Sequence, residues 1–143
     1  EEVQRPRIKG ISDEKEYIDD NHPMALELDK CNMDIQTAMN EHCDILIIEG
    51  IFALWDSRIL ERLNLKIFVD CDADERLVRR ISRNLSFGQD FKEITSRYVQ
   101  AVQPRQREYV EPTKWKADVI INGFSQSSVG MEMIMSWIKQ NIV

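Results

Sequence analysis

Three short apolar runs, separated by stretches with helical periodicity, constrain the fold of this chain more than any other feature. The runs cover residues 44–48, 66–70 and 117–121. The first is apolar without interruption after its leading aspartate, which is typical of a parallel strand buried on both faces. Strands that alternate with helices predict an α/β fold, in which a parallel sheet carries flanking helices.

Helical periodicity fills the intervals between these runs. Residues 1–20 are polar and irregular, and we expect them to form a loop with no more than a short helical turn. Pro104 is expected to bend or end the longest helix, because proline has no backbone N–H to donate. The predicted helices cover residues 25–39, 57–63, 72–85, 90–109 and 129–142.

Length and composition exclude several classes of protein. A chain of 143 residues, 43% of them hydrophobic, is long enough for one domain, which we assign to residues 1–143. The formal net charge of −6 argues against a nucleic-acid partner. No apolar run approaches the length of a membrane span, so we expect no membrane partner. Three widely spaced cysteines favour reduced, buried thiols and a cytoplasmic protein (Cys31, Cys43 and Cys71).

The helix after residue 70 concentrates positive charge in this acidic chain. Asp72 and Glu75 have the spacing of a capping box at its start. Four arginines follow at i, i+3, i+4 and i+7, within roughly 100° of arc, and apolar residues opposite them predict a core-facing stripe. Such a face either binds an anion such as a nucleotide phosphate or is a solvated surface paired with nearby carboxylates. The four are Arg76, Arg79, Arg80 and Arg83.

Acidic residues stand at the ends of the first two predicted strands. In open α/β sheets, ligands bind beyond the carboxyl ends of the strands, where Glu49 and Asp70 are placed. A carboxylate there can hold a magnesium ion through water, and Gly50 allows a sharp turn beside Glu49. The alternatives, that Glu49 caps the next helix and that Asp70 starts a turn, remain open. Asn21, before His22 and Pro23, either binds a ligand hydroxyl or caps a helix, and the cap is favoured.

Together these segments resemble the uridine–cytidine kinase branch of the P-loop kinases, near phosphoribulokinase and pantothenate kinase. The resemblance is collinear over nearly the whole chain and includes N-H-P-M-A, I-L-I-I-E-G-I-F-A-L, K-I-F-V-D, E-P-T-K and A-D-V-I-I. It implies a P-loop NTPase-like parallel sheet with flanking helices. The matching stretches are residues 21–25, 45–54, 66–70, 72–77, 79–84, 111–114 and 117–121, with Tyr98, Val102 and Pro104.

The resemblance also implies an activity and a set of site residues. It implies ATP-dependent phosphoryl transfer to the hydroxyl of a nucleoside such as uridine or cytidine, with ATP and Mg²⁺ as cofactors. Phosphoryl transfer depends mainly on positioning and charge neutralisation, which arginines can supply. The implied catalytic residues are Glu49, Arg80 and Arg83, with Glu49 also acting on the metal through water. The implied substrate-binding residues are Asn21, His22 and Arg80, and the implied nucleotide-binding residues are Arg79, Arg83 and Lys114.

The sequence departs from the family pattern at its start. Its five glycines form no G-x-x-x-x-G-K-[ST] motif, and the strand that carries the aspartate base is missing. In the family, the P-loop strand lies between the strands that match residues 45–48 and 66–70. We therefore expect an incomplete domain, inactive by itself, whose natural chain has a further segment of about 40 residues before Glu1. Residues 1–7 only weakly match the D-x-F-Y-R-P-R segment that follows the base.

Other departures leave the acceptor open. Two arginines that follow the helix in the family are Phe87 and Gln89 here. The stretch between Asp29 and Asp44 is too short for the β-hairpin that covers uridine in typical members. The alternatives are a kinase of another small alcohol, such as pantothenate or a sugar phosphate, and a non-catalytic kinase-like module that binds or regulates. The expected partners are a nucleotide and a small alcohol, and the sequence is compatible with a homo-oligomer.

Overall fold

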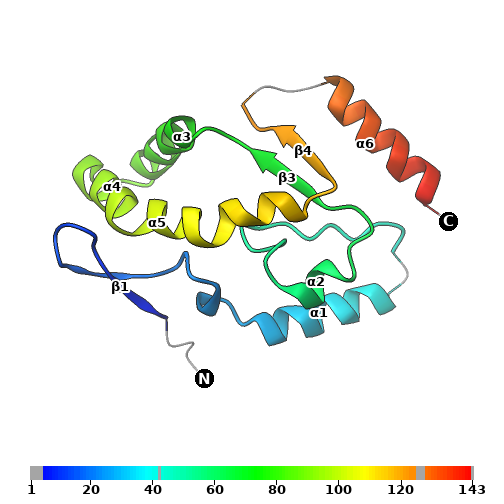
Figure 1. Cartoon of the computed structure of the whole chain (residues 1–143), viewed down its shortest axis with the longest axis horizontal. Coiled ribbons are helices and arrows are strands. Elements are labelled where there is room, and N and C mark those ends of the chain that lie inside the picture. Colours follow the sequence, from blue (N-terminus) through cyan, green and yellow to red (C-terminus); the bar gives the residue numbers. More distant parts are fainter. Residues whose placement is uncertain (1–4, 42, 125–127, 143) are drawn as a thin grey trace.

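A computed structural model describes residues 5–41, 43–124 and 128–142. Near its centre, strands β3 (Ile67–Asp70) and β4 (Val119–Asn122) pair in parallel, with Ile67 opposite Val119 and Asp70 opposite Asn122. Helices lie around this pair (Figure 1). The predicted mixed α/β class is therefore confirmed, and two of the three predicted strands form within two residues of their predicted bounds.

The apolar run 44–48 is not a strand, so this prediction is wrong. Within the described residues the parallel sheet contains only β3 and β4, and the run has no ladder partner. Ile47 is 81% exposed, and Ile45 and Leu46 are exposed as well. An extended segment needs a neighbouring strand to satisfy its backbone N–H and C=O groups and to cover its side chains. Burial of this run therefore depends on a partner that its own sequence does not specify.

The segment predicted as a loop at the N-terminus instead contains a β-hairpin. Strand β1 (Arg7–Lys9) pairs antiparallel with β2 (Glu16–Ile18), and Arg7 lies opposite Ile18. The hairpin loop is held from outside, because the side-chain amide of Gln100 accepts a hydrogen bond from the Ser12 backbone N–H at 2.9 Å and donates to the Ser12 hydroxyl at 2.7 Å. Strands of three residues are too short to show periodicity, and a distant residue stabilises them.

The first two helices, α1 and α2, lie close to their predicted positions. A 3-10 turn at Pro23–Ala25 precedes α1 (Leu28–Asn40), and the short α2 (Ser57–Leu60) is capped by Asp56, which accepts from the Arg58 N–H at 2.8 Å. The core between α2, β3 and the long helical segment is small. Its buried members are Phe52, Leu54, Phe68 and Val110.

Helix α3 (Ala73–Ser86) carries the arginines, but two predictions about it are wrong. Asp72 makes no side-chain cap, so the capping box does not form. None of its residues is fully buried, and Val78 and Leu85 are exposed rather than part of a core-facing stripe. The helix therefore lies at the surface, with its apolar side only partly covered.

The longest helical segment runs from α4 (Phe91–Arg97) to Lys116 and contains Pro104. Pro104 lies in α5 (Gln103–Arg105), and π-helical turns cover Tyr98–Val102 before it and Gln106–Val110 after it. A 3-10 turn, Glu111–Lys116, ends the segment. Wider π turns accommodate a proline that cannot donate to the regular ladder. The helical path thus continues past Tyr109, beyond its predicted end.

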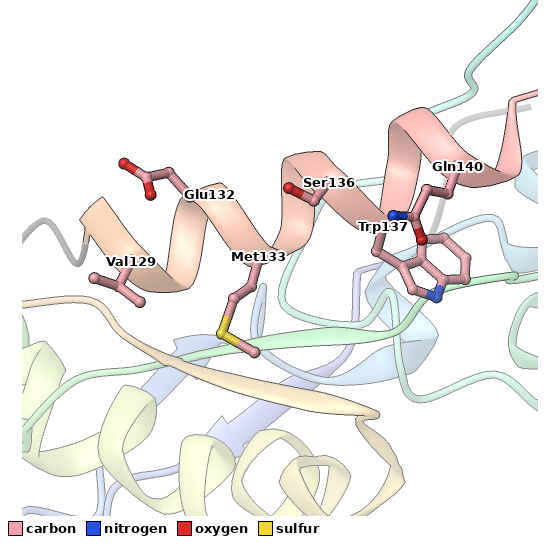
Figure 2. Close-up of a pocket in the computed structure, with 6 residues that line it drawn as sticks. All are labelled: Val129, Glu132, Met133, Ser136, Trp137 and Gln140. Carbon is pink, nitrogen blue, oxygen red and sulfur yellow. The ribbon is translucent and has the colours of Figure 1, made fainter.

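The closing helix α6 (Ser128–Asn141) buries Ile134 and leaves most of its apolar side chains exposed. The side chains of Val129, Met133 and Trp137 point the same way from it and line a shallow groove (Figure 2). No helix in the described part of the chain is long and apolar enough to cross a membrane. All three cysteines are free thiols, but none is buried as predicted: Cys31 and Cys71 are half-buried and Cys43 is exposed.

Candidate functional site

The arginine face of α3 divides into a paired part and an unpaired part. Arg76 forms an ion pair with Glu111 at 3.2 Å and donates to the Cys71 carbonyl oxygen. Arg79 donates to the Glu75 carboxylate at 2.7 Å and to the Gly123 carbonyl oxygen at 2.9 Å. Arg76 and Arg79 are therefore paired with nearby carboxylates, as in the alternative to anion binding that the sequence left open. The contacts to residues 111 and 123 also tie α3 to distant segments of the chain.

Arg80 and Arg83 form the unpaired part. Neither makes an ion pair within the described residues, and Arg83 only donates to the Asn84 side chain at 3.3 Å. Arg80 is half-buried, and its buried Nε has no hydrogen-bond partner among these residues. Burial, together with the nearby cations of Arg83 and Arg97, lowers the pKa of Arg80. A desolvated guanidinium beside like charges is a site where an anion would be stabilising.

Arg97, at the end of α4, connects this cluster to the segment that contains Asn21. Its guanidinium donates to the Asp20 carboxylate at 2.9 Å and to the Ile18 carbonyl oxygen at 3.1 Å. The same cation is close enough to lower the pKa of Arg80. Arg97 thus binds the segment that contains Asn21 and also acts electrostatically on Arg80. Sequence reasoning missed Arg97, because nothing in its local spacing marks it.

Asn21 and His22 differ in what their side chains do. His22, rather than Asn21, caps the following 3-10 turn by accepting the Met24 N–H at Nδ1, over 3.1 Å. Its Nε2 lies 2.9 Å from the Tyr109 hydroxyl, so both ring nitrogens of His22 are engaged. Asn21 is half-buried, and its side chain makes no hydrogen bond within the described part of the chain. Asn21 is therefore the residue of this pair that is free to bind a ligand.

The acidic residues at the predicted strand ends also differ. Asp70, at the end of β3, forms an ion pair with Lys114, the predicted nucleotide ligand. Glu49 is exposed and makes neither a helix cap nor an ion pair with described residues, so the alternative of a capping role does not apply. Gly50 has a φ of +147°, a conformation that favours glycine and turns the backbone sharply next to Glu49.

The described residues contain no group of three or more metal-ligating side chains. A kinase magnesium ion needs no such cage, because one or two carboxylates and the phosphates of the nucleotide commonly hold it. The single free carboxylate of Glu49 fits that donor set. The groove along α6 touches none of the predicted site residues (Figure 2).

Strand β3, paired in parallel with β4, leads into an arginine helix with two cations that have no ion-pair partner among the described residues, and these elements define an α/β protein. The family model described as "Phosphoribulokinase / Uridine kinase family" matches residues 13–130, and the chain belongs to that family, which has a P-loop NTPase fold. A uridine kinase from Lactococcus lactis subsp. cremoris is 40% identical over 100 residues, which cover 69% of this chain and 48% of the relative.

Two further relatives extend this comparison. A uridine kinase from Bacillus pumilus is 37% identical over 105 residues, covering 73% of this chain and 50% of the relative. One from Clostridium perfringens is 31% identical over 144 aligned positions, covering 84% of this chain and 69% of the relative. The chain thus spans about half the length of the first two relatives.

Proposed function

We propose that the protein containing this chain transfers the γ-phosphoryl group of ATP to a hydroxyl of a nucleoside, with uridine and cytidine as the first acceptors to test. The observation that carries the proposal is the pair Arg80 and Arg83, which have no carboxylate partner among the described residues, in a family that includes uridine kinases. In this proposal Arg80 acts on the acceptor side and Arg83 neutralises the phosphates.

The other predicted residues receive narrower roles. Asn21 hydrogen-bonds the acceptor, whereas His22 holds the segment in place because both of its ring nitrogens are occupied. Glu49 binds the magnesium ion through water, and the metal when bound neutralises phosphate charge. Lys114 reaches the nucleotide only by leaving Asp70. Arg79 holds the loop at Gly123 and so supports the nucleotide site without needing to touch its ligand.

The 143 residues contain no G-x-x-x-x-G-K-[ST] motif, and the family resemblance implies that the aspartate base for the acceptor hydroxyl is missing as well. We accordingly expect the isolated chain to be inactive, and activity to need residues that it does not contain. We further expect the protein to act in the cytoplasm, and a homo-oligomer remains compatible with the proposal.

The decisive experiment measures ADP formation by the protein at its natural length, with uridine and cytidine as acceptors and magnesium present. The expected result is turnover that needs both acceptor and metal, and that falls at least tenfold in Arg80→Gln. Failure to bind ATP and to phosphorylate either nucleoside would sink the proposal. A panel with pantothenate and sugar phosphates separates kinases of other alcohols.

The missing motif favours a second candidate, a non-catalytic module that binds a nucleotide or nucleoside. It predicts saturable binding of one of these ligands by the protein at its natural length, without ADP formation under any acceptor. Codons for a P-loop upstream of Glu1 would favour the enzyme instead.

A further inference from the structure

A polar network outside the arginine cluster converges on residues 19–22. It begins at Asp19, whose side chain is fully buried and whose Oδ2 accepts from Arg105 Nε at 2.7 Å. The other oxygen, Oδ1, is buried without a hydrogen-bond partner among the described residues. A buried ion pair with an unsatisfied oxygen contributes little to stability, so stability alone does not account for this arrangement.

Arg105 also fixes the ring of Tyr109, four residues further along the same helical segment. Its guanidinium carbon lies 5.5 Å from the centroid of that ring, and Nη1 forms an ion pair with Glu108 at 2.5 Å. Burial, followed by the neighbouring Glu108 carboxylate, raises the pKa of Tyr109. The ring of Tyr109 is thereby held by its own helical segment before it meets any partner from another segment.

That partner is His22, whose ring packs edge-on against Tyr109 with centroids 4.8 Å apart. The Met24 N–H donates to Nδ1 of His22, so Nδ1 is unprotonated, and the neutral ring carries its proton on Nε2. Nε2–H therefore donates to the Tyr109 oxygen at 2.9 Å. Both ring nitrogens of His22 thus have one partner each.

We propose that Tyr109 is a positioning residue for the acceptor: it fixes the orientation of the His22 ring, and thereby the place of Asn21. The inference rests on the proposed function, because it assigns Asn21 to the acceptor. The segment is held on both sides of Asn21, because Arg105 binds Asp19 and Tyr109 binds His22. A residue whose neighbours are fixed on both sides loses less conformational freedom when it binds a ligand.

The experiment compares Tyr109→Phe with Tyr17→Phe in the protein at its natural length. Both substitutions remove one hydroxyl that joins the N-terminal segment to the long helix, but Tyr17 bonds Asp13 and Ser96, away from Asn21. We expect Tyr109→Phe to raise the KM for uridine about three- to tenfold, with the KM for ATP and the melting temperature unchanged. Tyr17→Phe should leave both KM values unchanged.

An unchanged KM for uridine in Tyr109→Phe overturns the inference, and so does a parallel rise in both KM values with a lower melting temperature, which marks a purely structural role. The ¹⁵N spectrum of labelled histidine gives a readout without activity, and His42→Gln assigns the His22 signals. The Nε2–H proton of His22 should exchange slowly with solvent in the wild type and faster in Tyr109→Phe, because its acceptor is gone, whereas equal exchange contradicts the inference. Absence of uridine phosphorylation by the wild type contradicts the proposed function alone, and the exchange rate of Nε2–H then decides the role of Tyr109.

Discussion

Lys114 and Asp70 form an ion pair at the carboxyl end of β3, where ligands of parallel α/β sheets bind. Both side chains are partly exposed, so the pair is screened by water and is easily exchanged. A lysine proposed to bind a nucleotide is thus held by a carboxylate in the structure. If Lys114 binds the nucleotide as proposed, phosphate oxygens have to compete with the Asp70 carboxylate for its ammonium group.

The first prediction follows from this competition. Asp70→Asn should tighten ATP binding about two- to fivefold, because Lys114 no longer has to leave a carboxylate. Lys114→Ala should weaken binding in the wild-type background and abolish the gain in Asp70→Asn. Isothermal titration calorimetry on the protein at its natural length measures both. Asp118→Asn is the matched control, since it breaks an ion pair with Lys66 near the start of β3 and should change nothing.

The second prediction concerns the cost of keeping Arg80 charged. Burial and the neighbouring cations lower the pKa of Arg80, so the folded state binds its proton less tightly than the unfolded chain does. Arg80→Met, which keeps the volume and removes the charge, should raise the free energy of unfolding by about 1 kcal/mol after screening by water, and should remove activity.

Arg76→Met is the control for this prediction. It removes the same charge one turn earlier on α3, but it breaks an ion pair with Glu111 and a bond to the Cys71 carbonyl oxygen. It should therefore lower the free energy of unfolding. Urea denaturation of the three proteins gives the comparison, and a loss of stability in both variants contradicts the assignment of Arg80 as an unpaired functional cation.

The third prediction tests Arg83 as a phosphate ligand. Arg83→Ala should weaken ATP binding roughly tenfold or more in the protein at its natural length, the effect expected for a hydrogen bond to a charged group. In the 143-residue chain alone the same change should have little effect, because much of the phosphate site is absent. Arg7→Ala removes one exposed cation from the hairpin and is the control. Equal losses in Arg7→Ala and Arg83→Ala would indicate a general effect of charge.

Those parts of the fold that are periodic could be predicted from the sequence. The strand at residues 66–70 and helix α6 carry patterns that local sequence alone sets, and both form nearly where expected. The run 44–48 has an equally strong apolar pattern, but a strand also needs a ladder partner. The hairpin of β1 and β2 was missed because contacts from Gln100, far along the chain, hold its loop.

For the candidate site, spacing placed four arginines on one face but could not say which of them are free. Spacing could indicate the ion pair of Arg79 with Glu75 four residues earlier, but Glu111, which pairs with Arg76, and the Gly123 carbonyl oxygen, which accepts from Arg79, come from later segments. Local spacing carries no information about such contacts. The roles of Arg97 and Tyr109 were missed for the same reason, because each acts on a residue of the N-terminal segment.

The last prediction concerns acid stability and Asp56, the cap of α2. Hydrogen bonds from the Arg58 side chain lower the pKa of the buried Asp56 carboxyl below its usual range. Its contribution to stability is therefore complete above the pKa of the unfolded chain, about 3.9, and is lost as the pH falls through the lower pKa of the folded chain. Asp56→Asn should have a lower free energy of unfolding at pH 7, and this free energy should fall less than that of the wild type between pH 5 and about pH 2.

Asp29→Asn, which removes the exposed partner of the same arginine, is the control and should keep the wild-type dependence of the free energy of unfolding on pH. Urea denaturation across this pH range tests the idea, which fails if Asp56→Asn and the wild type lose stability in parallel.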